Sequence, residues 1–337
     1  MNQRHVILII IATLSPGNLL YAGKFAADFG RIGVGARSAA LGNAYTALAN
    51  DAAAFYWNPA GLPETSRLTF AFEHVPLFNG LAHYNTANAT LSLTSGIAVA
   101  AGWIRLGVDD IPRYAPLAGS RIDRLTTGQY RSTGENEGYF SDVEDAVFIA
   151  IGKKIKFDLG IGFKPRMLIL PVEVSVGLSA KFINQKLDDK TGTGQGLDAG
   201  VLLRTVSRNK AKGEATSWLG CSIVVRDLSR TTLAWNTNSN HKDQIETAIL
   251  CGLAGSFYFT SFESRLTVTI DQEVRPFQDR HVGVEFAFLH TIALRAGVWG
   301  ERFSAGAGLS LRFFRVDYAF VTHDLGHTHR VSGIVAF

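Results

Sequence analysis

Residues 171–182 read PVEVSVGLSAKF, and this pattern decides the fold class. Successive side chains of a β-strand point to opposite faces. Val172 and Val174 therefore share one face, whereas Glu173 and Lys181 share the other. The alternation continues for about ten residues, roughly twice the length of a usual strand in a soluble sheet. The segment predicts a strand that crosses a membrane within a closed barrel and turns its apolar face to lipid.

The same alternation recurs along the chain, for example in ESRLTVTID (263–271), HTIALRAGVW (290–299) and RVDYAFV (315–321). We predict about fourteen such strands, with about 20 residues for each strand and its connection. Residues 64–337 are therefore expected to form an all-β transmembrane barrel of antiparallel strands. The expected strands lie near 67–74, 82–94, 96–106, 142–156, 171–184, 196–206, 217–227, 244–258, 263–273, 280–289, 290–300, 302–312, 314–322 and 328–337.

The connections between these strands differ in length. Three longer ones, Gly107–Ser141, Gln185–Gln195 and Leu228–Asp243, are polar or rich in turn residues and are expected on the outer side. Connections on the opposite side should be short. The apolar segment Phe157–Leu170 is an exception, and a further small hairpin there is an open alternative.

The composition agrees with a membrane barrel. The chain is 47% hydrophobic and 18% charged, whereas a soluble domain carries about 25% charged residues. No run after the N-terminus approaches the roughly 20 apolar residues of a transmembrane helix. The net charge of +4 is small, and no basic block is interleaved with aromatic residues, so nucleic acid is not an expected partner.

The first residues have the features of a secretory signal. Arg4 is followed by the apolar run Val6–Leu14, and Leu20-Tyr21-Ala22 offers a small-residue cleavage site. We predict a signal peptide over residues 1–22. An anchor that is not cleaved is the alternative.

Charges on the polar strand faces should point into the lumen, where they contact a plug, water or one another. The predicted lumen charges are Lys181, Arg265, Asp271, Arg295, Arg315 and Asp317. Cys221 and Cys251 lie on strands that we expect to be neighbours. A cross-strand disulfide and two small lipid-facing residues are both open interpretations.

A different pattern precedes the strands. Residues 33–63 read GVGARSAALGNAYTALANDAAAFYWNPAGLP, and we predict a helix over Arg37–Leu48 and a short second helix from Asn50 to Tyr56. Pro59 ends the helix, because proline disfavours helix at the preceding residue. Many small side chains allow close approach of the backbone, which suits a plug inside the barrel. We therefore expect residues 23–63 to form a helical hatch in the lumen; a helix packed outside the sheet is the alternative.

Two segments carry a family resemblance. GARSAALGNAYTALANDAAAFYWNPAGLP resembles the N-terminal hatch of FadL-type outer-membrane proteins, and more closely that of the PorV/PorQ-like group. Within it, Asn58-Pro59-Ala60, followed by Gly61, is similar to the hatch motif of that superfamily. VDYAFVTHDLGHTHRVS (316–332) looks like the closing hairpin of the PorV/PorQ-like group.

The resemblance implies a plugged barrel of about fourteen strands in the bacterial outer membrane, surrounded by outer-membrane lipid. Members include transporters of hydrophobic compounds and, in the PorV branch, a component of type IX protein secretion. The chain ends at Phe337 after an alternating strand. This ending resembles the signal through which barrel assembly machinery recognises outer-membrane proteins.

Two groups of residues are predicted to matter for transport. Phe55, Tyr56, Trp57 and Leu62 are expected to line an apolar pocket between hatch and wall. Glycines weaken strand pairing, so Gly96, Gly102 and Gly107 on the third strand are expected to permit a side opening toward lipid. No nucleophile motif or zinc-ligand spacing is present, so we expect no enzyme activity, metal or cofactor.

Three functions compete at this point. The first is binding or transport of a hydrophobic small molecule across the outer membrane. The second is a PorV-like role in secretion, with Gly107–Ser141 and Leu228–Asp243 contacting secretion-machinery or secreted proteins. The third is a purely structural barrel.

Overall fold

The computed structural model describes residues 27–114, 117–126, 136–162, 168–208, 215–276 and 278–337. The predicted signal peptide, residues 1–22, lies outside these ranges and stays a prediction. None of the helices in the described ranges has both the length and the apolar content needed to span a membrane.

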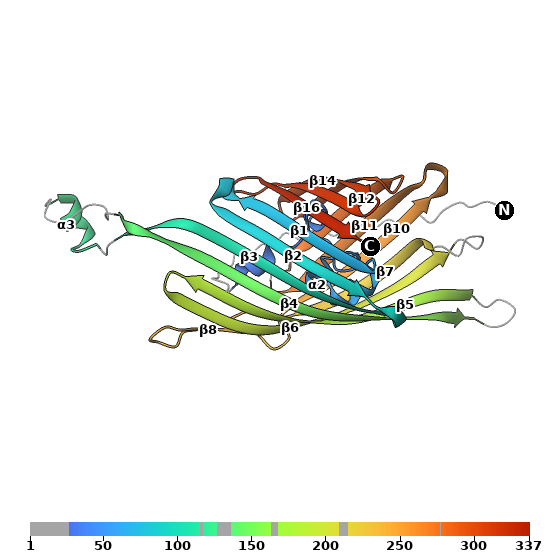
Figure 1. Ribbon diagram of the computed structural model, residues 1–337, viewed down its shortest axis with the longest axis horizontal. Coiled ribbons are helices and arrows are strands. Elements are labelled where there is room, and N and C mark those ends of the chain that lie inside the picture. The colour runs from blue at the N-terminus through green and yellow to red at the C-terminus, as the bar shows by residue number, and fades with distance from the viewer. Residues whose placement is uncertain (1–26, 115–116, 127–135, 163–167, 209–214, 277) are drawn as a thin grey trace.

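The described strands form a closed antiparallel barrel with 14 wall strands, which confirms the predicted fold class (Figure 1). Neighbours in the chain pair in order, and β1 pairs with β16 to close the wall, with Phe72 opposite Gly333. Closure leaves no open sheet edge around the lumen. The wall strands are β1 Leu68–Leu77, β2 Ala82–Ser92, β3 Ile97–Tyr114, β4 Asn136–Ile161, β5 Leu168–Leu187, β6 Lys190–Arg208, β7 Ala215–Arg226, β10 Ala248–Phe259, β11 Ser264–Arg275, β12 Arg280–Phe288, β13 Ile292–Trp299, β14 Arg302–Leu311, β15 Phe314–Val321 and β16 Thr328–Ala336.

The outer surface is apolar, as a surface in lipid requires. On β4, for example, Val147, Ile149 and Ile151 are exposed while the residues between them are buried. Exposed aromatic side chains gather near one end of the barrel, at Phe259, Phe262, Phe288, Phe313, Phe314 and Phe337. An apolar band with an aromatic girdle is the architecture of outer-membrane barrels. Phe337 stacks on Phe313 within this girdle, at a centroid distance of 5.7 Å; its recognition by assembly machinery stays a prediction.

The two ends of the barrel differ. At the end with the girdle, adjacent strands are joined by short turns such as Thr260–Phe262 (η5). We call the opposite end the mouth. There β3 and β4 project beyond the other strands and lead to the helix α3, Arg121–Thr126 (Figure 1). The connection between β7 and β10 forms a hairpin of β8 (Thr232–Trp235) and β9 (Lys242–Gln244) that pairs with β6.

Strands extend into all four of the predicted connections: β3 and β4 occupy the two ends of Gly107–Ser141, and β8 lies within Leu228–Asp243. The expected polar connection Gln185–Gln195 is wrong, because β5 and β6 stay paired up to the turn Asp188-Asp189. The open alternative of a further small hairpin within Phe157–Leu170 does not occur in the described residues, since β4 and β5 simply continue, with Ile161 opposite Leu168. In both places backbone pairing with an already aligned neighbour extends the strands beyond the point where the alternating pattern weakens.

The described part of the hatch, residues 27–63, lies inside the barrel (Figure 1). It contains η1 Asp28–Arg31, α1 Ala36–Ala40, α2 Ala54–Trp57 and the start of η2 Pro59–Glu64. Most of its side chains are buried. The chain thus passes from the mouth, where η1 lies, to the opposite end, where η2 leads into β1.

The long helix predicted over Arg37–Leu48 is wrong. The helix α1 ends at Ala40, because Gly42 and Asn43 both adopt left-handed backbone conformations. Wall residues replace the helical bonds that are lost: Tyr45 N and Thr46 N donate to Asp271 at 2.8 and 2.7 Å. Contacts with the wall therefore override the helix propensity of this stretch.

Candidate functional site

The Asn58–Gly61 motif forms the turn that fixes the part of the hatch farthest from the mouth. Asn58 is fully buried. Its Oδ1 accepts from Ala60 N at 3.0 Å, and its Nδ2 donates to Thr46 O at 2.8 Å. One side chain thus caps η2 and ties it to the preceding segment of the hatch. A Cβ on Gly61 would lie 2.0 Å from Ala49 O, so this position requires glycine.

Replacing Asn58 by alanine removes both hydrogen bonds and leaves the Thr46 carbonyl buried without a partner. We expect a loss of about 2–4 kcal/mol in the free energy of unfolding. Urea unfolding in detergent micelles measures this loss. Asn184, exposed on β5, is the matched control, and its replacement by alanine should change stability little. Equal effects of both substitutions would contradict this role of Asn58.

Glycines on the wall make room for the hatch backbone. Gly152, Gly177 and Gly200 are aligned in a row across β4, β5 and β6. A Cβ on Gly177 would lie 2.2 Å from Pro59 C, and one on Gly200 would lie 2.1 Å from Asn58 Oδ1. On the opposite wall, Gly283 and Gly297 receive Leu41 and Gly42 in the same way. At these glycines the hatch therefore lies in direct contact with the backbone of the wall strands.

These glycines were missed at the sequence level, although a signal exists. Gly177 has the same phase as Glu173, Ser175 and Lys181, so it lies on the inward face of its strand. A glycine at an inward position marks a place where another backbone approaches closely.

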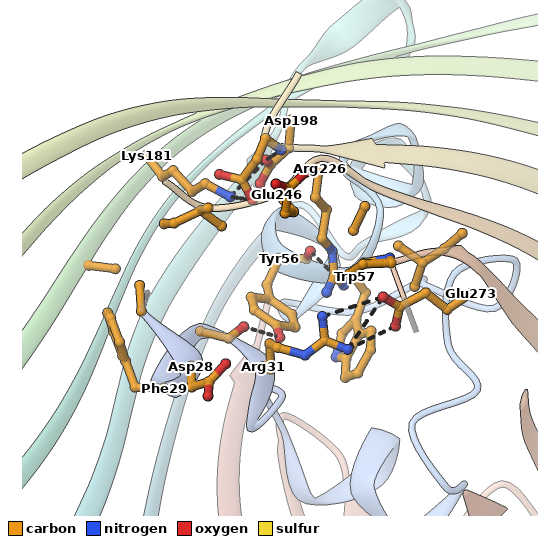
Figure 2. Close-up of a pocket in the computed structure, with 18 of the residues that line it drawn as sticks. Asp28, Phe29, Arg31, Tyr56, Trp57, Lys181, Asp198, Arg226, Glu246 and Glu273 are labelled. Carbon is orange, nitrogen blue, oxygen red and sulfur yellow. Dashed lines mark hydrogen bonds and ion pairs between the residues drawn. The ribbon is translucent and has the colours of Figure 1, made fainter. Parts of the chain in front are cut away.

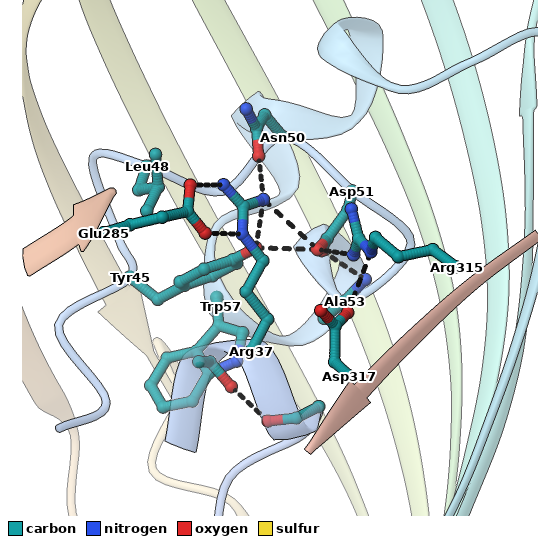
Figure 3. Close-up of polar contacts among 12 residues, drawn as sticks. Arg37, Tyr45, Leu48, Asn50, Asp51, Ala53, Trp57, Glu285, Arg315 and Asp317 are labelled. Carbon is teal, nitrogen blue, oxygen red and sulfur yellow. Dashed lines mark hydrogen bonds and ion pairs between the residues drawn. The ribbon is translucent and has the colours of Figure 1, made fainter. Parts of the chain in front are cut away.

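An ion-pair network joins the hatch to β12, β13 and β15. Figure 3 shows its contacts with Glu285 of β12 and with Arg315 of β15. Arg37 Nη2 lies 2.7 Å from Glu285 Oε1, and Arg37 Nη1 lies 3.5 Å from Asp51 Oδ2. Arg295 bridges Glu285 and Asp317 at 2.7 and 2.8 Å. The charges are buried, so each depends on its partners for stability.

The predicted lumen charges all lie in the barrel interior, where most of them make short polar contacts. Arg315 Nη2 pairs with hatch residue Asp51 at 2.7 Å. Asp271 binds the hatch backbone as described above. Lys181 Nζ lies 2.9 Å from Asp198 and 2.8 Å from Asp227, where it fixes the base of the β8–β9 hairpin. Arg265 Nη1 donates to Ser256 Oγ at 3.2 Å.

Two adjoining cavities open at the mouth above the hatch. The smaller has a volume of about 110 Å³ (Figure 2). The larger has a volume of about 630 Å³. Phe29, Arg31 and Trp299 line both of them, so η1 of the hatch lies between the two. Apolar lining comes from Tyr56, Trp57, Phe148 and Ile183 in the smaller cavity and from Leu77, Phe78, Leu106, Val321 and Leu325 in the larger.

Charged side chains also line the two cavities: Asp28 and Arg31 line both, Lys181, Asp198, Arg226, Asp227, Glu246 and Glu273 line the smaller, and Asp279, Arg302 and Arg330 line the larger. Arg31 pairs with Glu273 at 3.0 Å and so ties η1 to β11 (Figure 2). Arg226 lies over the Tyr56 ring at 4.6 Å from its centroid. Burial raises the pKa of Asp28, and the charge of Arg31 partly offsets this rise. In the loop between β15 and β16, burial and then the charge of Arg302 lower the pKa of His323.

The predicted pocket residues divide into two pairs. Tyr56 and Trp57 line the smaller cavity. Phe55 and Leu62 are fully buried in the packed core between hatch and wall. The division follows from the short α2 helix, which turns Tyr56 toward the mouth and packs Phe55 against β3 and β4.

The predicted side opening at the third strand is wrong. β3 pairs continuously with β2 and β4 on both sides of Gly102 and Gly107. Gly96 lies in the turn before β3 rather than on the strand. Gly102 serves a packing role instead: a Cβ there would lie 2.3 Å from Phe55 Cε2.

Both cysteines are free. Cys221 on β7 and Cys251 on β10 lie on adjacent strands, as predicted, but Cys251 is opposite Ile223 and Cys221 is opposite Leu253. Their diagonal placement on the outer face agrees with the interpretation as small apolar residues.

Comparisons with known proteins gave matches among solved structures. No protein family profile matches the chain, and a search of curated proteins found no match. The toluene transporter TodX of Pseudomonas putida has a TM-score of 0.47 and 11% identity over 90% of this chain and 97% of that chain. A Pseudomonas aeruginosa FadL homologue has a TM-score of 0.41 and 11% identity, covering 87% and 96%. The monoaromatic hydrocarbon channel CymD has a TM-score of 0.40 and 11% identity, covering 91% and 98%. These three solved structures are a toluene transporter, a FadL homologue and a hydrocarbon channel.

Proposed function

We propose that the protein is an outer-membrane barrel that binds hydrophobic small molecules at its mouth and passes them inward across the membrane. The observation that carries this proposal is the pair of adjoining cavities above the hatch. The larger, at about 630 Å³, has the volume of a small-molecule site, which is typically about 300–1,000 Å³. Its apolar side chains, Leu77, Phe78, Leu106, Val321 and Leu325, offer an uncharged compound a surface to pack against, beside charged side chains such as Arg302 and Arg330.

The hatch makes free diffusion through the lumen an unsuitable mechanism. Close contacts at Gly177 and Gly200 and the ion pairs of Arg37 hold the hatch against the wall. A molecule that enters at the mouth therefore meets a closed floor. Selective binding followed by local rearrangement of the hatch fits this architecture better than an open pore does.

Equilibrium binding tests the proposal. N-phenyl-1-naphthylamine is an uncharged dye whose fluorescence rises in apolar surroundings. Purified wild type should bind it saturably, and Leu106→Lys should weaken binding at least about tenfold, because a charge in an apolar site is costly. Leu228→Lys, at an exposed position outside the cavities, is the matched control. Equal binding by wild type and Leu106→Lys would overturn the assignment of the site.

A PorV-like role in protein secretion is the second candidate, and one observation favours it. The β3–β4 hairpin projects from the mouth (Figure 1) and presents the exposed apolar side chains Tyr114, Ile122, Leu125 and Tyr139. Such a surface is suited to contact with another protein. Deleting residues 112–138 should abolish secretion of a type IX substrate if the protein acts there, and should leave dye binding unchanged.

A further inference from the structure

The inner faces of β3 and β4 are apolar along the height of the hatch. Their inward residues are Ala98, Ala100, Gly102 and Ile104 on β3 and Ala146, Phe148, Ala150 and Gly152 on β4, and all of them are buried. We call this surface the apolar panel. Except for Ile104 and Phe148, its side chains are alanine or glycine, so the hatch rather than the wall fills the space in front of it.

Polar attachment of the hatch lies on other strands. In the described ranges, hydrogen bonds between residues 27–62 and the wall reach β1, β6, β7, β11, β12, β14, β15 and β16. Toward the panel the hatch presents the apolar side chains Phe55 and Leu62. The hatch is therefore fixed by hydrogen bonds on one side and by apolar packing on the other.

Phe55 packs against the panel at Gly102 and Phe148. Its ring lies on Gly102, where a Cβ would approach Cε2 to 2.3 Å and Cζ to 2.5 Å. The ring centroid lies 5.2 Å from that of Phe148, with the planes at 65°. This is an edge-to-face pair, a favourable arrangement of aromatic rings. The ring thus occupies an apolar slot formed by glycine, alanine and one aromatic side chain.

The slot adjoins the smaller mouth cavity. Ala146 and Phe148 of the panel also line that cavity. Tyr56, which lines it as well, has its ring centroid 6.4 Å from that of Phe148. At the far end the apolar surface stops at the ion pair between Lys154 Nζ and Glu64 Oε1, 2.9 Å apart. Phe55 is therefore the side chain that interrupts an apolar surface running inward from the cavity.

On the basis of the proposed function, we propose that the slot held by Phe55 is the next binding site of the passing molecule and that residue 55 determines which sizes pass. An uncharged apolar compound replaces the ring against Phe148 and Gly102. When the Phe55 side chain moves away, its packing contacts with the panel are lost, and the entering compound replaces them. The hydrogen bonds between the hatch and the other strands stay intact. An apolar cavity of about 150 Å³, of the kind a displaced ring leaves, is large enough for benzene.

Substitutions at residue 55 test this role. In cells whose outer membrane otherwise excludes N-phenyl-1-naphthylamine, Phe55→Ala should raise the rate of dye entry severalfold over wild type, and Phe55→Trp should lower it severalfold. Leu41→Ala is the control: Leu41 is an equally buried hatch residue, but it packs on Gly283 of the opposite wall. It should leave entry close to the wild-type rate. Equilibrium dye binding by each purified variant is measured alongside, and protease resistance shows that each variant is folded.

The outcomes separate this inference from the proposed function. If wild type binds the dye but all variants admit it at the wild-type rate, the role of Phe55 is overturned while the mouth site stands. If Leu41→Ala raises entry as much as Phe55→Ala, general loosening of the hatch explains the effect, and the inference also fails. If wild type neither binds the dye nor admits it faster than cells without the protein, both proposals fail.

Discussion

Replacing Gly177 by leucine is expected to force the hatch out of its position and to convert a silent barrel into a conducting pore. A Cβ at this position would lie 2.2 Å from Pro59 C and 2.4 Å from Ala60 N. These are backbone atoms held by the Asn58 turn, so no side chain rotates out of the way. In planar bilayers, wild type should show no stable conductance, whereas Gly177→Leu should show long-lived open levels.

Gly333→Leu is the matched control for this experiment. Gly333 also lies within a wall strand, β16, but a Cβ there meets no atom within 4 Å. The variant should stay as silent as wild type. Gly177→Leu could instead show no conductance, with a hatch as resistant to protease as that of wild type. That result would mean that the wall tolerates the extra side chain, and it would contradict a close fit between hatch and wall at Gly177.

Replacing Glu285 by glutamine is expected to destabilise the hatch by about 3–5 kcal/mol, because it leaves buried positive charge without its partner. Glu285 accepts from Arg37 at 2.7–2.8 Å and from Arg295 at 2.7 Å. Loss of its charge leaves three arginines, Arg37, Arg295 and Arg315, to share Asp51 and Asp317. Hydrogen exchange of the backbone at residues 36–50 should accelerate, and urea unfolding should begin at lower concentration.

Arg113→Gln provides the comparison for the ion-pair experiment. Arg113, near the end of β3, pairs with Asp188 in the turn between β5 and β6, and both side chains are about half exposed. An exposed pair is worth less than about 1 kcal/mol. If Glu285→Gln costs no more than Arg113→Gln, the network does not hold the hatch, and the glycine contacts carry its stability alone.

The barrel wall was predictable because the alternation within each strand is sufficient to identify that strand. In residues 171–182 the alternation of valine with glutamate, serine and lysine defines both faces without reference to any other strand. The same holds for the strands of the C-terminal half. Inward placement of Arg295, Arg315 and Asp317 followed from the same alternation, and in the structure Asp317 pairs with both arginines.

The path of the hatch was less predictable, because distant residues decide it. Helix propensity favoured a continuous helix over Arg37–Leu48, but Asp271, more than 200 positions away, binds Tyr45 N and Thr46 N. Asp51 accepts from Ala53 N and also pairs with Arg315 of the wall. Such pairings depend on which wall strand faces which hatch residue, and alternation within one strand contains no information about that.

The wall glycines show what alternation within a strand can predict and what it cannot. Phase within the strand places Gly177 inward and so predicts a close approach, although this signal was not used. The position of a glycine in the alternating pattern does not show whether it weakens strand pairing or makes room for a side chain of the hatch. Gly102 was predicted to open the barrel, yet its strand is fully paired and the glycine accommodates Phe55.

The most direct test of the central claim is to locate a bound apolar molecule. Crystals of the wild-type protein soaked with bromobenzene would place the compound through the anomalous scattering of bromine. We predict a peak in the cavities at the mouth, beside Phe29, Trp57 and Trp299. Bromine found only on the lipid-facing surface, with the mouth cavities holding none, would contradict the proposal that this barrel binds hydrophobic molecules above its hatch.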